Sequence, residues 1–193
     1  MFDKSFDFLY KNNMIEKMGE NDAKVHLLTF RTSKKRTIIV RVHEHKKESL
    51  FVIKFFDKNH RLSDDKFNFM VADGEASTII NTNIAIMQYF YNKNPYASFA
   101  FMGAPTKEEI RENTQLNRHS AYNTKRFRLY KRIMSLFFNP ARFLHIQNAN
   151  CSAYLIANRD FLYPEKDEKL KRIILTLKSA YSDEIEEEGF INL

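Results

Sequence analysis

A basic segment, residues 111–132, holds the side chains of this chain best suited to chemistry. It carries seven Arg and Lys against one acid, Glu112; seven minus one is +6, and the whole 193-residue chain has a net charge of +7. Clustered positive charge is typical of a surface that binds anions, with phosphate as the obvious ligand. The residues predicted to bind nucleic acid or a phosphorylated ligand are Arg118, His119, Lys125, Arg126, Arg128, Tyr130, Lys131 and Arg132.

The second half of this segment has the spacing of an amphipathic helix over residues 122–138, ending before Pro140. We expect its basic face to be exposed and contiguous. The apolar face comprises Tyr122, Leu129, Ile133, Leu136 and Phe137, and the opposite face comprises Lys125, Arg128, Lys131 and Arg132 with Thr124 and Ser135.

Arg126 departs from this pattern because it projects between Ile133 and Phe137, on the core side of the helix. A buried charge without a partner is costly, so this guanidinium needs one. One interpretation is a structural ion pair, with Glu75 as a candidate, or a side chain that leaves past the helix end. The other is an anion site at the helix N-terminus, where free N–H groups favour negative charge.

Other candidates for catalysis are isolated residues. His119, beside the basic cluster, could act as a general acid or base near a phosphate, although a single loop histidine more often has no such role. The single Cys151 lies next to a predicted tight turn without a base at fixed spacing, which favours a structural thiol. No catalytic residue is therefore assigned, and the chain is predicted more readily as a binding protein than as an enzyme.

Two histidines, His43 and His45, share one face of a predicted strand, with Glu44 between them on the other face. Such a pair can bind zinc if a third ligand is available, and His26 on the neighbouring strand is the candidate. An exposed polar strand edge explains the same pattern more simply, so we expect neither a metal centre nor a cofactor.

Composition narrows the class of protein. Hydrophobic residues make up 44% and aromatic residues 14% of the chain, which is enough for a packed core and argues against disorder. One cysteine excludes an intramolecular disulfide and a cysteine-based zinc site. The N-terminus does not have the pattern of a signal peptide, and no apolar run is long enough to span a bilayer. We therefore expect a cytoplasmic protein without membrane contact.

The spacing of apolar and turn-forming residues along the chain predicts an α+β fold. In it, helices pack on one face of a mostly antiparallel sheet, and the elements follow the order α-βββ-α-β-α-ββ-α. Residues 1–182 are expected to form a single domain, followed by an acidic tail over 183–193. The strand over 50–57 is apolar on both faces except at Lys54, which favours a central position. Helices are predicted over 2–10, 75–93, 122–138 and 166–181, with a helical turn at 107–113, and strands over 25–32, 37–43, 50–57, 97–102, 142–147 and 153–158.

Several of these pieces resemble a group of small uncharacterised bacterial proteins that share a domain of unknown function. They are the strand 99–103 ending in Gly103, the run Arg126-Phe127-Arg128-Leu129-Tyr130, and the strand 153–159, all within residues 72–160. This chain departs from the group by inserting polar residues 106–120. The resemblance implies no activity. It implies that Gly103, Arg126, Arg128 and Tyr130 form one site, and it suggests a mobile-element or phage-related setting.

Three functions remain open at this point. The first is a protein that binds nucleic acid or a phosphoanion through residues 103–132. The second is an interaction or assembly module whose basic face meets an acidic protein partner, including the acidic tail of another copy in a homo-oligomer. The third is an enzyme that processes phosphodiesters or nucleotides with His119, Arg118 and Arg126.

Overall fold

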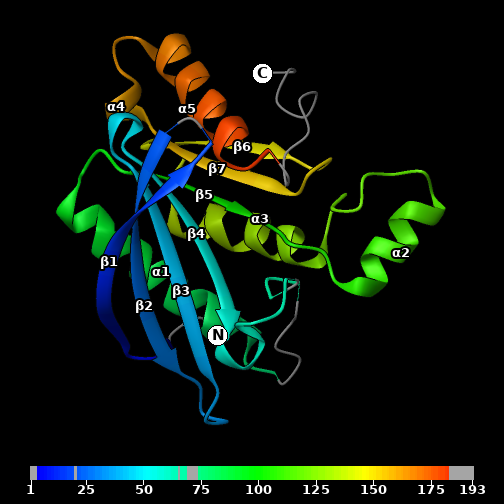
Figure 1. The fold of residues 1–193 in the computed structure, drawn as a ribbon. Coiled ribbons are helices and arrows are strands. Elements are labelled where there is room, and N and C mark those ends of the chain that lie inside the picture. The colour runs from blue at the N-terminus through cyan, green and yellow to red at the C-terminus, as the bar shows by residue number, and fades with distance from the viewer. Residues whose placement is uncertain (1–3, 20, 65, 69–73, 183–193) are drawn as a thin grey trace.

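The fold is built on one seven-stranded sheet in the order β1-β2-β3-β4-β5-β7-β6 (Figure 1). It is seen in a computed structural model that describes residues 4–19, 21–64, 66–68 and 74–182. Neighbouring strands are antiparallel except β4 and β5, which are parallel. The strands are β1 (Phe8–Met18), β2 (Asn21–Arg31), β3 (Thr37–His45), β4 (Leu50–Asp57), β5 (Ser98–Met102), β6 (Phe143–Asn148) and β7 (Ala153–Asn158).

The helices connect and cover these strands. The described α-helices are α1 (Ala76–Lys93), α2 (Lys107–Gln115), α3 (Lys125–Phe137), α4 (Arg159–Leu162) and α5 (Lys166–Ala180), and short 3-10 turns span Lys46–Glu48 and Lys58–His60. The protein is thus α+β with a mostly antiparallel sheet, as the sequence predicts.

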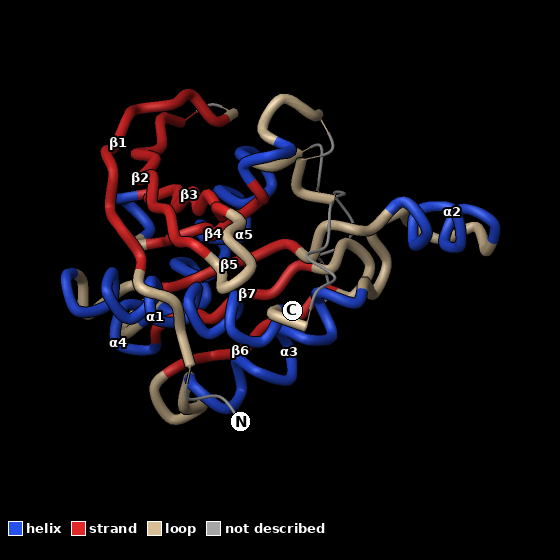
Figure 2. Tube along the Cα trace, turned by 90° about the horizontal axis from the view of Figure 1, so that it is seen from below, coloured by secondary structure: helices blue, strands red, loops and turns tan. Residues whose placement is uncertain are grey.

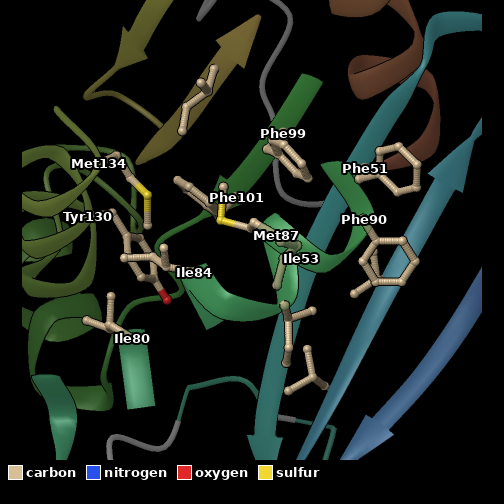
Figure 3. Close-up of a cluster of buried hydrophobic side chains, with 14 of the residues drawn as sticks. Phe51, Ile53, Ile80, Ile84, Met87, Phe90, Phe99, Phe101, Tyr130 and Met134 are labelled. Carbon is tan, nitrogen blue, oxygen red and sulfur yellow. The ribbon is translucent and has the colours of Figure 1, made fainter. Parts of the chain in front are cut away.

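One face of the sheet packs against α1 and α3. Its core joins alternate residues of the central strands to the apolar sides of both helices, as Figure 3 shows for ten labelled side chains. Phe51 and Phe99 are tilted against each other with ring centroids 5.9 Å apart, and Phe101 lies 4.9 Å from the ring of Tyr130 on α3. The aromatic residues of this chain are therefore used mainly to bind these two helices to the sheet.

The opposite face packs against α4 and α5. Here the intervening strand residues, such as Val52, Ala100 and Leu155, contact Ile173 and Leu177 of α5. The prediction that the helices pack on one face is therefore wrong. The physical reason is that β4, β5 and β7 are buried on both faces, so the sheet needs a helical layer on each side.

From β2 onward the predicted elements occur in sequence with the short helices α2 and α4 in addition to them, and before β2 a strand takes the place of the predicted helix. The antiparallel meander β2-β3-β4, the central position of β4, and the helices α1, α3 and α5 are confirmed. The strands β5, β6 and β7 also lie where the sequence indicates, whereas the short helix α4 was not predicted.

The predicted helix over 2–10 is wrong in its described part, because Phe8–Met18 forms strand β1. Phe6, Phe8 and Tyr10 do face the core, but they do so from an extended chain that runs along β2. A bulge between Tyr10 and Asn12 shifts the register of the pair. Such a bulge interrupts the simple alternation that signals a strand in sequence.

Residues 104–123, which we call the arm, leave the sheet after β5 and return at the start of α3. Within the arm, α2 stands away from the rest of the molecule in both views (Figures 1 and 2). The sequence predicts a surface excursion here with a helical turn, and the structure confirms it with a helix of nine residues. The predicted acidic tail lies outside the described residues.

Candidate nucleic-acid interface

The basic helix α3 begins at a cap that ties it to the sheet. Thr124 Oγ1 accepts a hydrogen bond from the backbone N–H of Phe127 at 3.2 Å and donates one to the carbonyl of Gly103 at 2.7 Å. Ser152, which directly precedes β7, accepts from the backbone N–H of Thr124 at 2.8 Å through its hydroxyl and donates to the carbonyl of Ala121 at 2.6 Å. The helix start is therefore fixed from both neighbouring strands.

Close packing at Gly103 depends on the absence of a side chain. A Cβ atom there would lie 2.6 Å from Thr124 Oγ1 and 2.8 Å from the backbone nitrogen of Phe127. These distances are shorter than any ordinary carbon contact, so only glycine lets β5 end directly beneath the first turn of α3. Gly103 thus has a packing role at the base of the arm.

Glu109 of the arm occupies the N-terminus of α3. Its carboxylate accepts the backbone N–H of Lys125 at 2.6 Å, and it also accepts the N–H and hydroxyl of Thr106 at 2.9 and 3.1 Å in a capping box of α2. Burial alone would raise the pKa of Glu109, but these hydrogen bonds and the charge of Lys125 hold it below its ordinary value. One buried carboxylate therefore joins the two helices.

This arrangement argues against an external anion at the start of α3. The favourable position for negative charge, beside the first free N–H groups, is taken by Glu109 from within the chain. The hypothesis of an anion site at that helix N-terminus therefore stays a prediction, and Glu109 is the group that competes with an external anion there. The sequence carried a usable signal, because Thr106 and Glu109 have the spacing of a capping box.

Four basic side chains of α3 form an exposed row. Lys125, Arg128, Lys131 and Arg132 are all exposed, as the helical wheel predicts. Arg128 donates to the carbonyl of Asn123, and Lys125 lies 3.7 Å from Glu108 in an ion pair between two exposed side chains. The ion pairs formed between described residues do not include Lys131 or Arg132.

The buried side of α3 is rotated relative to the predicted one. Ile133 is buried as expected, but Leu136 and Phe137 are exposed. Thr124, predicted on the exposed side, is buried as the cap. The helix starts at Lys125 rather than at 122, and its rotation follows from the cap. The residues that face the core are Phe127, Tyr130, Ile133 and Met134.

Arg126 lies half-buried between α3 and β4. Its Nη1 donates to the carbonyl of Phe67, and its guanidinium carbon lies 5.9 Å from the ring centroid of Phe55. Glu75 instead accepts from the backbone and hydroxyl of Ser33, so the predicted ion pair with Arg126 is not formed. Burial lowers the pKa of Arg126, and the opposing influences of Tyr130 and Glu109 are smaller.

Tyr130 is buried below the exposed row rather than within it. Burial raises its pKa to about 12, so its hydroxyl stays protonated at neutral pH. Tyr130 and Arg126 both line a largely apolar pocket of about 120 Å³ against Phe55 and α1. These two predicted ligand residues are therefore adjacent, and Lys125 of the exposed row lines the same pocket, whereas Gly103 lines a different one.

The remaining predicted residues lie on the arm. Arg118 is exposed and stacks over the ring of Tyr122 at 4.9 Å. His119 is half-buried, accepts the backbone N–H of Ala121 at 3.2 Å through Nδ1, and lines a pocket of about 220 Å³ with Gly103 and Cys151. His119 and Arg126 line different pockets, and a further pocket beside Arg126 shares Phe67, Met102 and Ala104 with that of His119, so the enzyme hypothesis stays a prediction.

The zinc hypothesis fails on geometry. His43 and His45 do share a face, but both are buried against Tyr181 near the end of α5 rather than exposed at an edge. His26 contacts Glu44 at 2.9 Å on the opposite face of the sheet. The described residues hold no group of three or more His, Cys, Asp or Glu side chains placed to bind one metal ion.

Comparison of the chain with models of protein families, with curated proteins and with solved structures finds no match. Among the described helices, none is both long and apolar enough to cross a membrane.

Proposed function

We propose that this protein binds nucleic acid through the phosphate backbone, using the exposed row Lys125, Arg128, Lys131 and Arg132 on α3 together with Arg118 on the arm. The observation that carries the proposal is that Lys131 and Arg132 are exposed and form no ion pair with any described residue. Basic residues that project without a compensating acid gain most from phosphate, because binding releases counterions condensed on the nucleic acid.

The arm supports this proposal through its position. It leaves the body just before α3 and projects from it (Figures 1 and 2), and it carries the exposed Arg111 and Arg118. Across the arm as a whole, the basic Lys107, Arg111 and Arg118 are balanced by Glu108, Glu109 and Glu112, so its contribution is these exposed side chains rather than a net positive charge. The stacked pair of Arg118 and Tyr122 offers a flat surface suited to an unpaired base. These features favour contact with a backbone that passes along α3 and the base of the arm.

The test is the salt dependence of binding, measured by fluorescence anisotropy with labelled single-stranded and duplex oligonucleotides. Lys131→Gln/Arg132→Gln should lower the magnitude of the log–log slope by about 1.4 for single strands and about 1.8 for duplex, because each lost phosphate contact removes about 0.7 or 0.9. The chain offers a matched control, Lys171→Gln/Arg172→Gln, which removes the same two residue types from an exposed stretch of α5.

The control should keep the slope of the parent protein. Equal loss in both double variants would mean that overall charge, rather than the α3 row, governs binding. Absence of binding at low salt would reject the proposal and leave the basic row available to an acidic protein partner.

A further inference from the structure

Three polar side chains on adjacent strands form a continuous hydrogen-bonded chain. Tyr10 of β1 has its hydroxyl 2.8 Å from Nδ1 of His26 on β2, and Nε2 of His26 lies 2.9 Å from Oε2 of Glu44 on β3. His26 is only 6% exposed and meets the ring of Phe90 edge-on at 4.9 Å. The imidazole is therefore held in place by both of its nitrogens and by α1.

The partners determine where the protons lie. The hydrogen bond from His26 holds the pKa of Glu44 below its ordinary value, so this carboxylate is charged and accepts from Nε2. With that nitrogen as the donor, Nδ1 of a neutral imidazole accepts the phenolic proton of Tyr10. The hydrogen-bonded chain therefore runs from a carboxylate through an imidazole to a hydroxyl, which is the arrangement that activates a nucleophile.

The hydroxyl of Tyr10 has a further donor beside it. The side-chain amide of Asn13 donates to it at 3.1 Å, a contact that favours negative charge on the phenolic oxygen. Lys93 of α1 places its ammonium 6.0 Å from the ring centroid of Tyr10 and 2.5 Å from the hydroxyl of Tyr89. Developing charge on Tyr10 would thus meet a polar donor and a nearby cation.

The chain of three residues opens onto a pocket of about 260 Å³ at the C-terminal end of α1. Tyr10, His26 and Glu44 line it together with two cations, Lys24 and Lys93, and with the aromatic rings of Phe51 and Phe90. Such a lining suits a small molecule with an aromatic or apolar body and a carboxylate or phosphate group.

We propose that this pocket is a reactive site in which Tyr10 is the nucleophile, His26 the base and Glu44 the residue that positions His26. Its substrate class is an ester of a small anionic molecule. The phenolic oxygen bonds to the acyl carbon as the acyl–oxygen bond breaks, and the phenolic proton passes through His26 to the departing alcohol. Water then hydrolyses the tyrosyl ester. This proposal is independent of nucleic-acid binding, because it uses none of the α3 or arm residues.

The test uses a benzenesulfonyl fluoride with a para carboxylate as a surrogate electrophile. The oxygen of Tyr10 bonds to sulfur, fluoride leaves, and the proton passes to His26. Labelling is followed over time by peptide mass spectrometry, with Tyr96 and Tyr163 as internal references because they are 55% and 78% exposed. Tyr10 should react faster than both references, and His26→Gln should slow its labelling by about 100-fold, the lower end of what a positioned base contributes.

Glu44→Gln provides a second variant, since it keeps an oxygen acceptor for His26 while removing the charge; it should slow labelling of Tyr10 but not of the references. The matched probe with a para aminoethyl group tests the two lysines. The carboxylate probe should react faster in the parent, and Lys93→Gln should bring the two rates closer together. The proposal is overturned if Tyr10 is labelled no faster than Tyr96 and Tyr163. It is also overturned if His26→Gln and Glu44→Gln label Tyr10 as fast as the parent protein does. In either case the three residues only hold the strands together.

Discussion

Acid should destabilise this protein well above the pH at which its carboxylates titrate, because of a buried histidine pair. His43 and His45, each 3% exposed, lie on the α5 face of the sheet, and the hydroxyl of Tyr181 is 2.9 Å from Nδ1 of His43 and 3.2 Å from Nε2 of His45. Within the described structure, Nε2 of His43 is buried without a hydrogen-bond partner. A proton added there would carry charge into a site that cannot solvate it.

Burial, with Arg41 and Lys54 nearby, lowers the pKa of His43 from 6.5 to about 3. Burial likewise lowers the pKa of His45 from 6.5 to about 4. Because the native values lie below the unfolded ones, the unfolded chain binds these protons first. The stability contribution is complete above pH 6.5 and is lost as the pH falls toward 4 and then 3. At pH 5 each histidine lowers the free energy of unfolding by about 2 kcal/mol relative to neutral pH, and the pair lowers it by about 4 kcal/mol.

The assay is urea denaturation of the parent protein and of His43→Gln/His45→Gln at a series of pH values between 7.5 and 5. The free energy of unfolding of the parent should fall by about 4 kcal/mol more than that of the variant across this range. Comparing the two proteins cancels the contribution of every other titrating group. Each single variant should remove about half of the difference.

The result that refutes this reasoning is a pair of parallel curves. In that case His43 and His45 would take up protons in the native state as readily as in the unfolded chain, and their burial would not exclude charge. This conclusion also holds if the variant is less stable than the parent at every pH, as long as the free energy of unfolding changes with pH by the same amount in both proteins.

Two further predictions concern the base of the arm. Glu109→Gln should destabilise the protein by about 1–3 kcal/mol in urea denaturation, because it weakens charge-assisted hydrogen bonds to Lys125 and Thr106, whereas its exposed neighbour Glu108→Gln should cost less than about 1 kcal/mol. Equal effects would show that Glu109 is not a structural link between α2 and α3. Gly103→Ala should cost about 1–3 kcal/mol, because the new methyl group overlaps the first turn of α3; a thermal midpoint unchanged from the parent would contradict this packing.

Local patterns in the sequence determined most of the secondary structure. The alternation in β3, the double-sided apolar run in β4 and the 3.6-residue period of α1 are each specified within a dozen or so residues, so they can be read without knowledge of their partners. The exposure of the basic residues on α3 belongs to the same category, because the helical period separates long charged side chains from apolar ones.

Tertiary contacts decided the features that the sequence did not specify. Strand β1 depends on β2 for its hydrogen bonds, and its bulge hides the alternation that would identify it. The rotation of α3 depends on the cap at Thr124, which is fixed by Gly103 and Ser152 from two other strands. These partners are separated by many residues along the chain, and only folding brings them together.

Of the two candidate sites, one is determined by local sequence and the other by tertiary structure. The basic row on α3 is a property of composition and helical period, and the sequence therefore located it. The relay of Tyr10, His26 and Glu44 exists only because three strands are in one particular register, which places one polar residue from each strand side by side. A shift of one residue in either pairing would turn these side chains to opposite faces of the sheet, so no pattern within a single strand could reveal them.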